Sequence, residues 1–307
     1  MMELLNKCSE EELQYRENFK RDYKFSCPVI DDTDIFKKSL IIADLVNEWN
    51  DYYEMCKTIP KFDDYRREMR NTIIQLIISV KGYANMSVTN LKLYDKYKGP
   101  KSYLRDELIG KRLVSVDLVK GNYQAMKYLN SAYVDNTNTY EELIGKYTKY
   151  EPMIRSKFFR QMIFGQLNPQ IQGMVQQEMI GNIIEQIYKK IGFFEICFLS
   201  NDEVIFVINS DLEKQQIKDV VNTLSYEIRV TEFKIEKIAN SYEESWYVKH
   251  YIDTNKSRLM GVHTRYLMQV YNHVMGIENT TKDFWWRECG RLCMIMEPEK
   301  FLLQYNT

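Results

Sequence analysis

Apolar residues follow a helical period over much of the first 110 residues of the chain. From residue 32 to residue 55 they recur every three or four positions, as they do along the buried face of a helix. Pro60 interrupts this pattern, and residues 62–83 resume it with a polar first half and an apolar second half. Residues 92–105 are polar and contain a Gly-Pro pair, which indicates a loop with short helical pieces.

After residue 110 the pattern changes to short apolar runs that are typical of strands. Residues 113–116 form a compact run with two valines, which ends at Asp117. Two further runs between residues 193 and 208 are separated by Asn201 and Asp202, so a hairpin is expected there. Residues 225–239 alternate between apolar and polar side chains and predict another strand.

Helical spacing returns between these strands, in two helices over residues 153–190 and in one over residues 211–224. The order is therefore strand, helices, hairpin, helix, strand. This is the βαββαβ order of the ferredoxin-like fold, enlarged between its first strand and its hairpin. We expect an α+β protein with a helical N-terminal region (1–110), a ferredoxin-like sheet domain (111–239) and a small helical C-terminal module (240–307).

Composition limits the partners, metal sites and cellular locations that can be expected for the protein. The 307 residues carry a formal net charge of −1, so a nucleic-acid partner would have to be held by local basic patches. Six cysteines without a CxxC pair and three histidines argue against structural zinc and favour free thiols in a reducing compartment. No apolar run is long enough to cross a bilayer, and the first residues lack an apolar signal core. We expect a soluble cytoplasmic protein, or one in the host cytoplasm if it is viral, without a membrane partner.

Acidic residues stand at two points that the expected fold brings together. Asp117 ends the first strand, while Asp202 and Glu203 lie at the hairpin turn beside it. Two-metal nucleotidyl transfer requires carboxylates that converge on two divalent ions about 3.5–4 Å apart. We predict Asp117 and Asp202 as the main ligands of two Mg²⁺ or Mn²⁺ ions. Glu203 would be a third or outer ligand, and the carbonyl of Leu118 an extra oxygen donor.

Three segments in this order resemble the A, B and C motifs of palm-domain nucleic-acid polymerases and related nucleotidyltransferases. VSVDLVKGNY, which contains Asp117, resembles motif A, and LSNDEVIFV, which contains Asp202, resembles motif C. The acidic pair in the latter is similar to that of the family A DNA polymerases and of tRNA-histidine guanylyltransferases. Between them KFFRQMIFG, residues 157–165, resembles motif B of the family A and B DNA polymerases. Asn201 stands where the family usually has an aromatic residue or glycine.

The motif B resemblance implies contacts with an incoming nucleotide. Lys157 would contact the triphosphate, with Arg160 or Arg155 beside it, and Phe164 would lie under the base pair. Tyr123 falls near the place where polymerases set a bulky residue against the sugar 2′ position. The nucleotide-binding residues that we expect are Lys157, Arg160, Arg155, Gln161, Tyr123 and Lys120.

The same resemblance makes residues 153–190 a fingers-like insertion and residues 240–307 a thumb-like module. Basic and aromatic residues alternate between positions 246 and 265, which suits a grip on a duplex through its phosphates. Nucleic-acid contacts are expected from Lys249, Lys256, Arg258 and Arg265. A surface helix pair with no ligand explains this composition equally well.

Each candidate site also has an ordinary structural explanation. Asp202 and Glu203 would suit any polar hairpin turn, Asp117 would cap a helix, and Lys157 would lie on a solvated helix face. Together and in motif order they favour a template-dependent polymerase that transfers nucleotides from NTPs or dNTPs to a 3′-hydroxyl. The alternatives are a guanylyltransferase-like nucleotide adder and a non-catalytic palm. The latter would bind nucleic acid or protein within a larger replication or transcription assembly.

Overall fold

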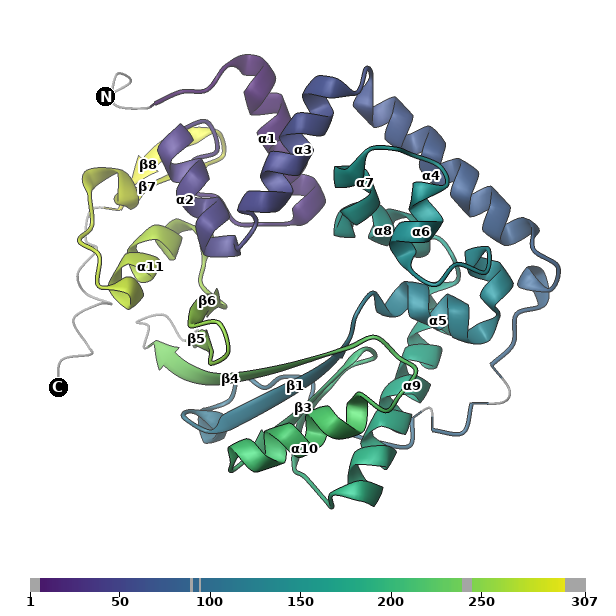
Figure 1. Ribbon diagram of the computed structural model, residues 1–307. Helices are drawn as coiled ribbons and strands as arrows, with labels where there is room; N and C mark the ends of the chain where they lie inside the picture. The colour runs from purple at the N-terminus through teal and green to yellow at the C-terminus, as the bar shows by residue number, and fades with distance from the viewer. Residues whose placement is uncertain (1–5, 89–90, 94, 239–244, 296–307) are drawn as a thin grey trace. The chain divides into compact units, whose positions relative to one another are not determined.

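The computed structural model describes residues 6–88, 91–93, 95–238 and 245–295, and it combines helices with a mainly antiparallel sheet (Figure 1). The chain divides into two compact units. The central unit comprises residues 61–235 and 251–255, and the terminal unit comprises residues 1–60, 236–250 and 256–307. The boundary that we expected near residue 110 falls within the central unit, whereas the one expected near residue 240 is close to the division between residues 235 and 236.

Packing explains the difference in boundaries. In the central unit, α4 (Phe62–Ser79) packs against α8 (Lys157–Phe164), so the N-terminal helices divide at Pro60. In the terminal unit, α11 (Leu267–Met275) returns to pack against α2 (Thr33–Ala43). Lys38 of α2 also donates a hydrogen bond of 2.5 Å to Asp283. Such long-range contacts leave no change of composition at the boundary for a sequence to reveal.

The strands form a six-stranded sheet with the order β2-β3-β1-β4-β5-β6. Its strands are β1 (Arg112–Leu118), β2 (Ile196–Leu199), β3 (Glu203–Ile208), β4 (Ile228–Ile238), β5 (Trp246–Tyr251) and β6 (Lys256–Met260). β1 pairs antiparallel with β3 on one side and with β4 on the other, and β2 pairs antiparallel with β3. The predicted first strand, hairpin and later strand are therefore confirmed, as is a fold that mixes helices and strands.

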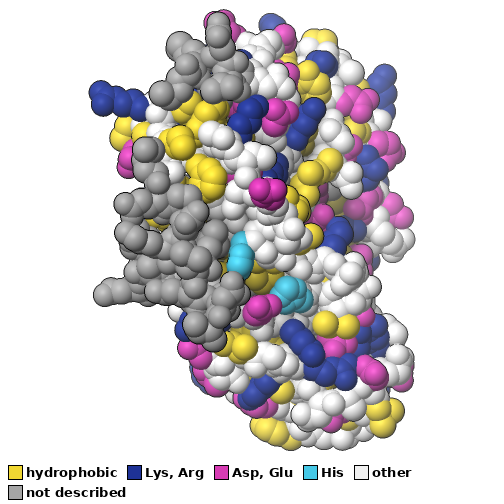
Figure 2. Space-filling model, turned by 90° about the vertical axis from the view of Figure 1, so that its left-hand side faces the viewer, with side chains coloured by type: hydrophobic (Ala, Val, Ile, Leu, Met, Phe, Trp, Pro, Cys, Tyr) yellow, Lys and Arg dark blue, Asp and Glu magenta, His cyan; other side chains and the backbone are white. Residues whose placement is uncertain are grey.

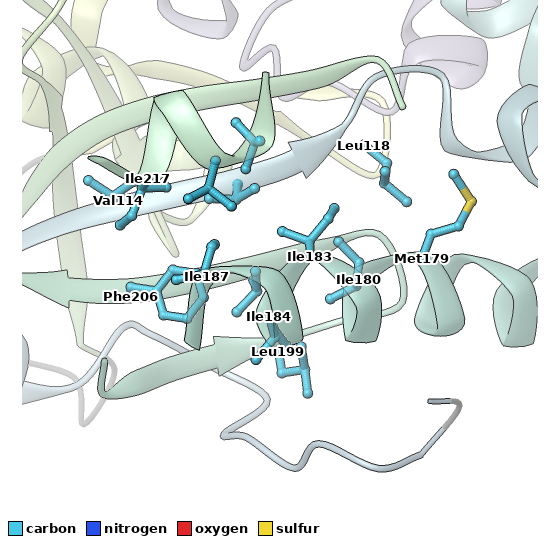
Figure 3. Packing of buried hydrophobic residues seen from close by; sticks show 14 of the residues in the cluster. Val114, Leu118, Met179, Ile180, Ile183, Ile184, Ile187, Leu199, Phe206 and Ile217 are labelled. Atoms are coloured by element: carbon cyan, nitrogen blue, oxygen red, sulfur yellow. The ribbon is translucent and has the colours of Figure 1, made fainter. Parts of the chain in front are cut away.

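Two helices cover one face of the sheet in the central unit (Figure 1). α9 (Pro169–Lys190) begins with a proline, which suits the first helical turn, and α10 (Asp211–Val221) is capped by Ser210. Because side chains alternate along a strand, every second residue of β1 points toward these helices. Figure 3 shows the resulting core, which includes Val114, Leu118, Ile180, Ile183, Ile184, Ile187, Phe206 and Ile217.

Four short helices fill the long connection between β1 and α9. They are α5 (Gly121–Leu129), α6 (Tyr140–Gly145), α7 (Glu151–Arg155) and α8. Ser156 caps α8, because its hydroxyl accepts a hydrogen bond of 3.1 Å from the amide of Phe159. This cap fixes where α8 begins.

The terminal unit is built on aromatic packing between α1 (Glu10–Tyr23), α2 and α3 (Val46–Thr58). The ring centroid of Trp49 lies 5.2 Å from that of Phe19 and 4.8 Å from that of Phe36. The C-terminal part contributes β5, β6, α11, β7 (Trp285–Glu288) and β8 (Arg291–Met294). It is therefore not the small helical module that we expected. Residues 246–251 are mostly aromatic or β-branched, and side chains of that kind favour strands.

The composition led us to expect free thiols and no helix that crosses a membrane. All six cysteines are free thiols. In the described part of the chain, no helix has both the length and the apolar character that a bilayer crossing requires.

Candidate active site

The end of β1 and the β2–β3 turn lie side by side, as the sequence predicted. Asp117 is paired with Glu203 in the register of β1 and β3. The amide of Leu118 donates a hydrogen bond of 2.9 Å to the carbonyl oxygen of Asp202. Two residues that are 84 positions apart in the chain are thus joined through the main chain.

Asp117 and Glu203 lie on the face of the sheet that α9 and α10 leave uncovered, whereas Asp202 lies at the turn, next to α5 and α9. Val114, Val116 and Leu118 belong to the core under the helices, so Ser115 and Asp117 point to the opposite face. On that face the hydroxyl of Ser115 donates a hydrogen bond of 2.5 Å to a carboxylate oxygen of Glu203. Glu203 is therefore held toward the middle of β1.

The turn that carries Asp202 is held by its own side chains and by two helices. The hydroxyl of Ser200 donates to the Asp202 carboxylate at 3.1 Å and accepts from the amide of Glu203 at 3.0 Å. At Gly121, the first residue of α5, a Cβ would lie 3.5 Å from the Cβ of Asp202 and 3.2 Å from the amide nitrogen of Gln176 on α9. A Cβ at Gly121 would be tight against Gln176 and in ordinary van der Waals contact with Asp202.

Charged residues from three other elements surround Asp117. Arg229 of β4 is its neighbour in the β1–β4 register and donates a hydrogen bond to its carboxylate. Burial raises the pKa of Asp117, and the negative charge of Asp202 raises it further. Arg229 and Lys157 oppose this effect without cancelling it. The electrostatic coupling shows that Asp202 and Lys157 both lie close enough to act on this carboxylate.

α8 carries two cations, Lys157 and Arg160, one helical turn apart. Phe159 and Ile163 are buried, whereas Lys157 is exposed and Arg160 is partly exposed. Among the described residues, neither Lys157 nor Arg160 has an ion-pair partner. The guanidinium of Arg160 lies 5.6 Å from the ring centroid of Tyr140, and burial lowers its pKa. Two cations without ion-pair partners among the described residues form a place suited to an anion.

The other residues predicted to contact a nucleotide are placed differently. Arg155 and Gln161 are exposed, at the end of α7 and on α8 respectively. Lys120 pairs with Glu141 at 2.9 Å and with Glu227 at 3.8 Å, so its charge is already compensated.

Tyr123 and Phe164 lie in the core, which corrects the positions expected from the resemblance. Tyr123 is 3% exposed, and its hydroxyl donates to the carbonyl oxygen of Thr137 at 2.9 Å. Phe164 is fully buried, with its ring centroid 6.2 Å from that of Tyr123 and 6.4 Å from that of Tyr140. Neither ring is exposed to a sugar or a base pair, because the short helices α5, α6 and α8 pack around them.

Of the four predicted nucleic-acid contacts, only Arg258 is both exposed and without an ion-pair partner in the described part of the chain. Lys249 is buried, and Lys256 pairs with Asp44 at 2.9 Å. Arg265 lies over the rings of Tyr266 and Trp286, at 4.6 and 5.9 Å from their centroids. On the face shown in Figure 2, basic side chains are interspersed with acidic ones.

The donors at the candidate site suit a hard cation. Mg²⁺ prefers carboxylate and carbonyl oxygens, which Asp117, Asp202 and the main chain of Leu118 provide. Among the residues that the structure describes, no three His, Cys, Asp or Glu side chains already converge as a metal-binding group. Glu203 is turned toward Ser115, and Arg229 contacts Asp117. Two carboxylates that repel each other are therefore available, and Arg229 would have to move for both to share a cation.

A shallow depression of about 420 Å³ adjoins Asp202 on the β2 side. Its lining includes Lys101, Gln176, Asn201 and the ring of Phe198. Gln177 of α9 donates a hydrogen bond of 2.7 Å to the side-chain oxygen of Asn201, which steadies the rim. The depression leaves Asp202 accessible from the side opposite Asp117.

Sequence reasoning missed Arg229, Gln176 and Gly121. The alternation over residues 225–239 predicted a strand, but only the register of β1 and β4 shows that Arg229 is opposite Asp117. Gln176 belongs to a helix whose apolar period was recognised, and a polar residue on such a helix carries no signal of its own.

Comparison with protein-family models, curated proteins and solved structures finds no match to this chain. The function is therefore argued from the geometry of the site.

Proposed function

We propose that the chain is a palm-type nucleotidyltransferase that extends a nucleic-acid strand along a template. The observation that carries the proposal is the adjacency of Asp117 and Asp202, with Lys157 acting on Asp117 from α8. Carboxylates and cations are needed together when a triphosphate is held by divalent ions and its remaining charge is neutralised by the protein.

The topology of the central unit supports the proposal. β3 lies between β1 and β2 and is antiparallel to both, and β4 lies antiparallel on the other side of β1. This agrees with the split βαβ arrangement of a ferredoxin-like βαββαβ palm, with α5 to α8 as an insertion. In such a palm the first strand and the hairpin carry the acidic residues, as they do in this chain.

Each residue has a separate role in the proposed reaction. Asp117, Asp202 and the carbonyl of Leu118 would hold the divalent ions, which lower the pKa of the attacking hydroxyl and neutralise charge on the triphosphate. Lys157 and Arg160 would orient the triphosphate from α8. The 3′-hydroxyl oxygen forms a bond to the α-phosphorus while the bond from that phosphorus to the bridging oxygen breaks. Pyrophosphate leaves, and the hydroxyl proton passes to solvent.

A second candidate is a non-catalytic palm within a larger replication or transcription assembly. The contacts that favour it are those of Arg229 with Asp117 and of Ser115 with Glu203, because both acidic groups already have partners. The two candidates differ in one measurable property, which is strand extension that depends on a divalent metal.

The experiment is extension of a labelled primer on RNA and DNA templates, with NTPs or dNTPs and with Mg²⁺ or Mn²⁺. Asp117→Asn and Asp202→Asn should each abolish extension. Asp219→Asn, an exposed residue of α10 that bonds Gln215, is the matched control and should extend like the wild type. The nucleotide that is incorporated identifies the template and product, and addition without a template would indicate the guanylyltransferase-like reaction. No extension by the folded wild-type protein under any condition would favour the non-catalytic candidate.

A further inference from the structure

Arg229 contacts the carboxylate of Asp117, one of the two groups proposed to bind a divalent ion. The two residues are direct neighbours in the register of β4 and β1, and the guanidinium donates to the carboxylate. Of the described residues, Arg229 alone forms an ion pair with Asp117. Asp202, the other carboxylate, has no ion pair within the described part of the chain, and only the hydroxyl of Ser200 contacts it.

The exposure of the two partners is unequal. The side chain of Arg229 is 67% exposed, whereas that of Asp117 is 19% exposed. By contrast, Arg112 at the other end of β1 is 26% exposed and pairs with both Asp211 and Glu232. Arg229 reaches a recessed carboxylate from the solvent side, so it can swing away without disturbing the core.

We propose that Arg229 is a displaceable counterion, which balances Asp117 in the metal-free protein and leaves it when a divalent cation binds between Asp117 and Asp202. This inference rests on the proposed function, since it assumes that the two carboxylates share a cation. A guanidinium and a divalent cation compete for the same oxygen atoms, and their positive charges repel each other at that distance. Arg229 therefore weakens metal binding and protects the apo site from adventitious cations. Once displaced, it joins Lys157 as a cation that faces a bound triphosphate.

The competition predicts the direction in which the affinity for a divalent ion changes when Arg229 is replaced. Removing a positive charge beside a divalent ion should tighten binding by about threefold to thirtyfold, given the size of charge interactions in water and at a protein surface. Arg229→Lys keeps the charge and should bind metal like the wild type. Lys234→Gln is the matched control, because Lys234 lies on the same strand about 16 Å away and makes no ion pair among the described residues.

The test is direct Mn²⁺ binding to the full chain, measured from the free-ion electron paramagnetic resonance signal. The variants are Arg229→Gln, Arg229→Lys, Lys234→Gln and Asp117→Asn, each first shown to be folded by circular dichroism. Tighter binding by Arg229→Gln alone supports the inference. Unchanged or weaker binding by Arg229→Gln, with wild-type binding that Asp117→Asn abolishes, overturns the counterion role and leaves the proposed function standing. If no variant binds Mn²⁺, the metal-dependent function fails and the inference fails with it.

Discussion

Asp117 and Glu203 are direct partners across β1 and β3, yet their carboxylates have different neighbours. Asp117 contacts Arg229, which is a mostly exposed side chain. Glu203 accepts a hydrogen bond from Ser115, which is 5% exposed and belongs to the same strand as Asp117. The free-energy cost of releasing the carboxylate for metal binding therefore differs between Asp117 and Glu203. We expect the two residues to have different roles for the same reason.

Substitution of the acidic residues should produce graded losses. Asp117→Asn and Asp202→Asn should each lower the rate of primer extension by at least about 10³-fold. Each substitution removes a carboxylate that would hold the divalent ions, and these ions neutralise charge in the transition state. Glu203→Gln should cost only about tenfold to a hundredfold, as outer ligands do. Single-turnover rates at saturating metal measure the difference. Equal losses at Glu203 and Asp202 would make Glu203 a direct ligand.

Asp117 should make the folded protein less stable at neutral pH. Burial, which Arg229 only partly offsets, raises the pKa of Asp117, so the folded state binds its proton more tightly than the unfolded state. The stability that the protonated form contributes is present below the unfolded pKa and is lost as pH rises through the folded pKa. Asp117→Asn should therefore raise the free energy of unfolding at pH 7, and the gain should shrink toward pH 4. Urea unfolding of this variant and of Asp219→Asn at both pH values tests the sign.

Tyr123 should act as a core residue and leave sugar selection unchanged. Tyr123→Leu should lower the free energy of unfolding by about 2–4 kcal/mol, and so should Tyr140→Leu, since both rings pack against Phe164. The ratio of rates with NTPs and dNTPs should be the same in Tyr123→Leu and in the wild type. A relaxed ratio in Tyr123→Leu, with Tyr140→Leu unaffected, would restore the role that the motif resemblance gave to Tyr123.

Lys157 should affect nucleotide binding more than strand binding. Lys157→Gln should raise KM for the nucleotide by about tenfold, the scale of one charge-assisted contact with phosphate, while the Kd for primer and template stays the same. Lys189→Gln, an exposed change near the end of α9, is the control and should alter neither constant. A larger effect on strand binding than on KM would move Lys157 from the triphosphate to the nucleic-acid backbone.

The central strands were predictable because local patterns determine them. The run that ends at Asp117 and the polar turn at Asp202 each have a signal that depends on a few neighbouring residues. Their adjacency followed from the order of elements. The position of Arg229 did not, because it depends on a pairing register between distant strands, and a shift of one residue would turn Arg229 to the other face.

The C-terminal region was harder to predict for a different reason. Lys249 is charged, but it lies in a strand whose first four residues are all buried, and the charge alone suggested a surface position. Phe164 was assigned to a base pair from its place in a motif, while the packing of α5, α6 and α8 buries it. For both residues, tertiary packing determines how exposed the side chain is. Composition alone does not predict that exposure.

The hydrogen bond from the amide of Leu118 to the carbonyl oxygen of Asp202 has an evolutionary consequence. The main chain itself fixes the distance between these two acidic positions. Any pair of side chains at these positions would therefore have the same spacing. Two substitutions would remove the charges and keep the scaffold, and two reversions would restore them. Loss or recovery of the proposed activity would therefore leave the fold of the central unit unchanged.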